Sequence, residues 1–99
     1  MKKTILTMAL ALLGTTLATT AWSKDDPAAG AQLYATNCTA CHGADRAGVA
    51  GAFPALTDVG KRLDAAQIKQ KIRNGGGLMP PFPQLSQQEV DDLASFLAQ

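Results

Sequence analysis

The chain has 99 residues and a formal net charge of +1, with basic and acidic residues interspersed along it. This length suits one compact domain and argues against two, because single domains usually run from about 50 to about 200 residues. The near balance of charge gives no support for a nucleic-acid partner, and it predicts local, modest recognition of any protein partner.

The first 23 residues are expected to be a secretory signal peptide. A basic start precedes the apolar run Ile5–Ala18, which is shorter than the roughly 20 residues that a membrane-spanning helix needs. Small residues at Ala21 and Ser23 favour cleavage after Ser23, with a cut after Ala21 as the alternative. The run therefore predicts export to the periplasm, or its Gram-positive counterpart, without stable membrane insertion. An uncleaved anchor is the other interpretation.

The mature domain would then be residues 24–99, with seven basic and eight acidic residues and a net charge of −1. A chain this short buries little surface, and such domains commonly depend on disulfides, a metal or a cofactor for stability. The first helix should begin after Asp26-Pro27, which pairs a capping residue with a proline suited to the first helical position. Gly30 and Tyr34 lie one turn apart on it, where we expect a crossing with the last helix near Leu93 or Phe96. That spacing favours a close helix pair.

The segment Cys38-Thr39-Ala40-Cys41-His42 carries the candidate chemistry. C-x-x-C-H is the attachment signature for c-type haem: two thiols on one short turn can add to two vinyl groups, and the next residue offers an imidazole to the iron. These are the only two cysteines and the only histidine of the chain. We therefore expect one covalent haem c, bound through Cys38 and Cys41, with His42 as an iron ligand.

The same residues allow two other interpretations. A C-x-x-C pair in an oxidising compartment could form a disulfide or act as a dithiol oxidoreductase, but no βαβ pattern accompanies it. A structural zinc site requires four ligands, whereas residues 24–99 offer only Cys38, Cys41 and His42. Both interpretations are weaker than haem attachment.

The middle of the chain is expected to form loops and one amphipathic helix. Residues 43–60 are rich in Gly and Ala and should form a loop, with one helical turn near Asp58 to Arg62. Asp64 and Gln67 form a variant capping box, and Asn74-Gly75 should end the helix that follows. Ile68 and Ile72 give that helix its buried stripe.

Met79 is the candidate second iron ligand, because it is the only methionine of residues 24–99. Gly75 to Gly77 precede it and Pro80 and Pro81 follow, so a loop of unusual path with a stiff end could hold the sulfur in place. The alternative is a methionine that fills a gap in the core. Together, His42 and Met79 would leave no open iron position and would raise the reduction potential.

The last helix begins with a full capping box, Ser86-Gln87-Gln88-Glu89, and repeats apolar residues at helical spacing to the end of the chain. No segment alternates as a strand does, so the fold class is all-α. Four apolar residues fall in expected loops, where a haem would give them a partner. They are Phe53, Leu56, Leu78 and Phe82. Lys61, Arg62 or Arg73 could meet the haem propionates, although solvated surface is the ordinary role of such charges.

The pair formed by Cys38-x-x-Cys41-His42 and Met79-Pro80-Pro81-Phe82 resembles the small bacterial class I c-type cytochromes, over residues 29–98. The resemblance implies three or four short helices wrapped around one haem, with the carbonyl of Pro54 bonded to the Nδ1 proton of His42. The Trp that many relatives place near a propionate is missing from residues 24–99, so the propionate contacts are not transferred.

The function predicted from these residues is one-electron transfer between larger redox proteins, a donor reductase or dehydrogenase and an acceptor oxidase or reductase. Docking should be weak and transient, the protein monomeric, and no substrate bond should be made or broken. A haem enzyme or gas sensor would be favoured if Met79 were not a ligand. A bound electron-transfer subunit of a dehydrogenase or oxidase complex is a further alternative.

Overall fold

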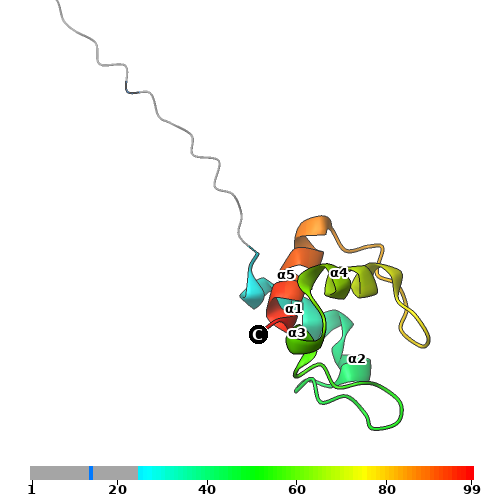
Figure 1. Ribbon diagram of the computed structural model, residues 1–99. Helices are drawn as coiled ribbons and strands as arrows, with labels where there is room; N and C mark the ends of the chain where they lie inside the picture. The colour runs from blue at the N-terminus through cyan, green and yellow to red at the C-terminus, as the bar shows by residue number, and fades with distance from the viewer. Residues whose placement is uncertain (1–13, 15–24) are drawn as a thin grey trace, which may run out of the picture.

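The computed structural model describes residue 14 and residues 25–99, so the predicted signal peptide lies outside the described residues apart from Gly14. The described chain is helical and has no strand beyond two isolated bridges. Its helices are α1 (Pro27–Asn37), α2 (Thr39–His42), α3 (Val59–Arg62), α4 (Ala65–Asn74) and α5 (Gln87–Leu97) (Figure 1). The all-α prediction is confirmed. Helices number five rather than three or four because α2 and α3 are single turns of four residues each.

The predicted helix ends are confirmed by their caps. Asp26 accepts hydrogen bonds from the first turn of α1, and Pro27 is its first residue. Asp64 and Ser86 each form a complete capping box with the residue three positions on. Such caps satisfy backbone N–H groups that a helix start leaves unpaired. The three longer helices therefore begin where the sequence predicts.

The first and last helices cross at Gly30. A Cβ atom there would collide with the backbone carbonyl of Asp92 and would lie 2.8 Å from the Cβ of Phe96, so only glycine allows this approach. One turn further, the rings of Tyr34 and Phe96 lie 5.5 Å apart in a tilted arrangement. The predicted crossing is confirmed, with Phe96 opposite Tyr34. The side chain of Arg46 closes the other side, 5.0 Å above the Phe96 ring.

Buried residues of α1, α3, α4 and α5, together with one loop residue before α5, form the apolar core. Its members are Tyr34, Val59, Ile68, Ile72, Leu85, Val90, Leu93, Ala94 and Leu97. The aliphatic stripe predicted on α4 is thus buried against α5. Among the described residues, no helix combines the length and the apolar character needed to cross a membrane.

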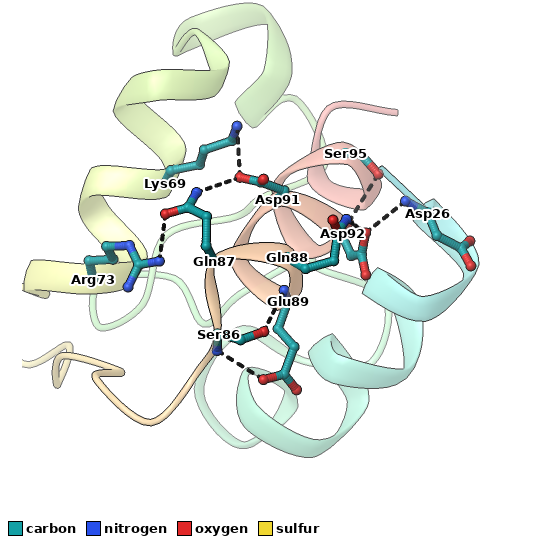
Figure 2. Close-up of polar contacts among 10 residues, drawn as sticks. All are labelled: Asp26, Lys69, Arg73, Ser86, Gln87, Gln88, Glu89, Asp91, Asp92 and Ser95. Carbon is teal, nitrogen blue, oxygen red and sulfur yellow. Dashed lines mark hydrogen bonds and ion pairs between the residues drawn. The ribbon is translucent and has the colours of Figure 1, made fainter. Parts of the chain in front are cut away.

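Polar side chains fix α5 to its two neighbours, as Figure 2 shows. Asp92, although buried, accepts hydrogen bonds from the backbone N–H of Asp26 and from the Gln88 amide, both at 2.8 Å. On the other side, Asp91 pairs with Lys69 of α4 at 2.9 Å. The Lys69–Asp91 pair joins α4 to α5, and α4 forms one wall of the site described next.

Candidate functional site

Residues of α2 and of the loop that follows α4 line a cavity of about 290 Å³. Figure 1 shows where these two segments lie in the fold. Its lining includes every residue predicted to attach or ligate a cofactor, namely Cys38, Cys41, His42 and Met79. A second cavity of about 210 Å³ reaches deeper, to Ile68 and Leu97 of the core. The two share five lining residues, so we describe them as the outer and inner compartments of one site. The shared residues are Cys38, His42, Pro54, Lys71 and Met79.

The thiols and the imidazole are presented by the single turn of α2. The backbone N–H groups of Cys41 and His42 both donate to the carbonyl of Cys38, at 3.3 and 3.0 Å, which winds the five-residue motif into one compact turn. Tyr34 of α1 supports this turn from behind, because its buried hydroxyl donates to the carbonyl of Gly43 at 2.6 Å. Burial raises the pKa of the Tyr34 hydroxyl, which therefore remains a donor.

The ring of His42 is buried and held from one side. Its Nδ1 atom lies 2.9 Å from the carbonyl oxygen of Pro54. Because a carbonyl only accepts, Nδ1 carries the proton, and in the neutral ring this tautomer has its lone pair on Nε2. Nε2 has no hydrogen-bond partner among the described residues. The bond to Pro54 that the family resemblance implies is thus present, and it leaves the other nitrogen available to bind a metal.

Both cysteines are free thiols and half-buried. Burial raises the pKa of the Cys38 thiol to about 11, with a smaller contribution from Cys41. Cys38 is therefore protonated at neutral pH in this environment, unlike the low-pKa cysteines of dithiol oxidoreductases. This observation disfavours the dithiol interpretation.

Met79 is presented by a tight loop. The backbone of Gly76 and Met79 exchanges two hydrogen bonds, at 2.9 and 3.0 Å, and Phe82 donates to the carbonyl of Ile72 at 3.1 Å. Gly75 has a φ of +66°, and a Cβ atom there would collide with the carbonyl of Met79. Glycine at the end of α4 thus allows the chain to fold back sharply. The loop brings a residue 37 positions after His42 into the same cavity.

The apolar loop residues are divided between the two compartments. Phe53, Leu78 and Phe82 line the outer one, and Leu56 lines the inner one. Leu78 is nevertheless 80% exposed, so it stands at the rim. All four predicted apolar residues are therefore gathered at the site, as is Pro54.

The three basic residues considered for the haem propionates lie in different places. Arg62 lines the inner compartment, whereas Lys61 and Arg73 line neither. Arg73 instead donates to the Gln87 side chain of α5 at 2.9 Å. Lys71, which the sequence did not single out, lines both compartments. The weak signal that could have found it is its position on α4, next to the buried residue Ile72.

These residues fit a covalently bound haem. Two thiols, a buried imidazole nitrogen without a partner and a thioether line one hollow with mostly apolar walls, which suits a large apolar disc with a central iron. Within the described residues, no three or more His, Cys, Asp or Glu side chains gather to hold a bare metal ion. The zinc interpretation therefore has no support in this part of the chain.

Comparison with known proteins agrees with the geometry. The family model described as "Cytochrome C oxidase, cbb3-type, subunit III" matches residues 25–97. Cytochrome c-550 of Bacillus subtilis (strain 168) is 40% identical over 75 residues, covering 76% of this chain and 60% of that protein. Cytochrome c6 of Picosynechococcus sp. (strain ATCC 27264 / PCC 7002 / PR-6) is 34% identical over 113 residues, covering 97% of this chain and 92% of that protein.

A third relative, cytochrome c-551 of Bacillus subtilis (strain 168), is 45% identical over 51 residues. This chain spans 60% and 44% of the lengths of the two Bacillus proteins, and nearly all of the cytochrome c6. One conclusion follows from the match over residues 25–97, the helical fold and the two cysteines spaced as C-x-x-C-H. The chain belongs to the c-type cytochromes, as a small member of the class I kind that holds a single haem.

Proposed function

We propose that this chain is an exported carrier of single electrons that holds one haem through thioether bonds from Cys38 and Cys41. The observation that carries the proposal is the common cavity lined by both thiols, the imidazole of His42 and the thioether of Met79. When bound, haem supplies reversible one-electron chemistry at its iron. The chain contributes attachment, orientation and burial, and it makes or breaks no substrate bond.

His42 and Met79 are proposed as the two iron ligands. The bond from Nδ1 to Pro54 orients the His42 ring and makes Nε2 a better ligand. Met79 is supported by its place in both compartments and by the closed loop that presents it. With protein groups on both sides, the iron has no open position, which favours electron transfer over binding of a gas or substrate.

Apolar contact with the ring is proposed for Phe53, Pro54, Leu56 and Phe82, which line the hollow around these ligands. Their role is to exclude water, because burial of the haem is one of the features through which a protein tunes the potential.

Residues 1–23 are proposed to be the signal peptide that directs the chain to the periplasm, so the mature protein would begin at Lys24. Isolating the protein from the periplasmic fraction and sequencing its N-terminus tests this directly. A first residue of Lys24 supports the proposal, and Trp22 would move the cut to Ala21. Recovery in the membrane fraction with residues 1–23 intact would contradict it.

Partners are proposed to be larger redox proteins that dock weakly at the outer compartment, and the carrier is proposed to be a monomer. A bound subunit of an oxidase is the second candidate, favoured by the description of the matching family model. Size-exclusion chromatography of gently lysed cells separates these two candidates. Elution at the size of the isolated chain supports a diffusing carrier, and co-elution with a large complex supports the subunit.

Mass measurement and optical spectra test the cofactor and its ligands. Protein made in a host able to attach haem should gain the mass of one haem, and a Cys38→Ser, Cys41→Ser double variant should not. Met79→Ala should keep its colour and lose the weak long-wavelength band of an iron–sulfur(Met) bond, while Leu78→Ala keeps the band. Bare polypeptide in the first experiment, or an unchanged band in Met79→Ala, would overturn the corresponding part of the proposal.

A further inference from the structure

Lys71 stands out because it brings a charge to both compartments of a site whose walls are mostly apolar. Among the described residues, it is the one ammonium or guanidinium that lines both compartments. The residue is exposed and directly precedes the buried Ile72 of α4. A lysine in such a position lays its aliphatic stem along apolar surface while its ammonium reaches water. Lys71 is therefore part of the cavity wall and of its rim.

The ammonium of Lys71 has no partner, in contrast to its neighbours on the same helix. Lys69 pairs with Asp91 at 2.9 Å, and Arg73 donates to Gln87 at 2.9 Å, so both point to α5. Lys71 makes no hydrogen bond or ion pair within the part of the chain described. Its charge is thus uncompensated by a direct contact.

The ammonium also lies against the loop that presents Met79. A Cβ atom built on Gly76 would be 2.7 Å from the Lys71 Nζ, and Gly76 shares both backbone hydrogen bonds with Met79. The unpaired charge therefore sits beside the turn that holds the proposed sulfur ligand.

We propose that Lys71 raises the reduction potential of this protein, because it places a positive charge at the mouth of the site. This inference rests on the proposed function. The oxidised centre carries one more positive charge than the reduced centre, so a nearby cation disfavours the oxidised state. Lys71 acts through its charge alone, since it is neither an iron ligand nor a point of haem attachment.

The test is a redox titration of the complete haem protein and its variants. Lys71→Met keeps an unbranched side chain of similar length without the charge, and Lys71→Gln is a second neutral variant. At a fixed ambient potential, each should lower the ratio of reduced to oxidised protein severalfold, where a tenfold change equals about 59 mV for one electron. Lys71→Arg should restore most of the ratio. The difference should shrink with added salt, because exposed charges are screened.

Lys61→Met is the matched control, since Lys61 is exposed on α3 and lines neither compartment. It should leave the ratio within about twofold of wild type, because an exposed charge outside the cavity wall is screened by water and salt. An unchanged ratio in a normally coloured Lys71→Met protein would overturn this inference alone. A Lys71→Arg variant whose ratio changes as much as that of Lys71→Met would also overturn it, because the change would then come from altered packing and not from charge. Wild-type protein without attached haem would overturn both this inference and the proposed function.

Discussion

The hydroxyl of Tyr34 links the helix crossing to the segment that carries the thiols. It is buried, donates to the carbonyl of Gly43 and sits on a ring that packs against Phe96. Tyr34→Phe keeps the ring and removes the donor, so we expect a loss of about 1 kcal/mol in the free energy of unfolding. Chemical denaturation measures it. Thr36→Ala, which removes an exposed hydroxyl on the same helix, should cost less than about 0.5 kcal/mol; equal losses would contradict the assigned role.

At the scale of single residues, the sequence indicated which side chains line the cavity, because the residues able to bind a cofactor are few. Two cysteines and the histidine fall within five positions, and one methionine remains in residues 24–99. The charges were less predictable. Arg73 and Lys71 lie two positions apart on α4, but only the structure shows that one faces α5 and the other faces the cavity. The local sequence does not distinguish a lysine at the rim of a cavity from a lysine that only contacts solvent.

Among the elements, the pair α1 and α5 depends most on one position. Gly30→Ala should raise helix propensity, yet its Cβ would meet the backbone of Asp92. We therefore expect a net loss of about 1–3 kcal/mol, typical of an overpacked core, measured by thermal or denaturant unfolding. The control is Ala35→Gly, an exposed change on α1 that should cost about 1 kcal/mol through propensity alone. A Gly30→Ala protein more stable than wild type would show that the helices do not cross here.

The contact between α4 and α5 is expected to depend on pH. The hydrogen bond from Lys69 is the main cause that lowers the pKa of Asp91 below its ordinary 3.8. Its stabilisation is therefore present above that value and lost as the pH falls through the lowered pKa. Asp91→Asn should cost about 0.5–1 kcal/mol at neutral pH, because both partners are partly exposed.

Denaturant unfolding at several pH values checks this expectation, since the difference from wild type should shrink as the pH falls below 3.8 and through the lowered pKa of Asp91. Asp58→Asn is the control, because the Arg62–Asp58 pair is about half exposed on both sides and should contribute less. A difference between Asp91→Asn and wild type that stays constant over this range would contradict the assigned cause.

Helix starts were predictable because capping is local, and all three longer helices begin at the expected cap. Burial of Asp92 was not predictable, because its partner Asp26 lies 66 positions away. The helical turn at α3 was predicted and confirmed. The path of residues 43–56 was not, since it depends on bonds such as that from Leu56 to the carbonyl of Arg46.

For the molecule as a whole, the fold is expected to depend on the group that binds at the site, because the site adjoins the apolar core. The core residues Ile68, Ile72 and Leu97 also line the inner compartment, so the apolar core and the site are continuous. Chains of this size rarely hold together without a cofactor or crosslink. We expect the Cys38→Ser, Cys41→Ser double variant to lose most of its helix signal in far-ultraviolet circular dichroism at room temperature.

The coloured Met79→Ala protein is the comparison, because it keeps the covalent group and should keep its helices. A double variant with full helix content and a cooperative thermal transition would show that the polypeptide folds unaided.

The closed turn from Gly76 to Met79 has a kinetic consequence. Two backbone hydrogen bonds between Gly76 and Met79 close the turn, and the backbone N–H of Phe82 donates to the carbonyl of Ile72 in α4. A sulfur atom held by so constrained a turn should move little when the iron gains or loses an electron. The reorganisation energy of each electron transfer should therefore be low. A high rate of electron transfer would then depend on the rigidity of this one short turn.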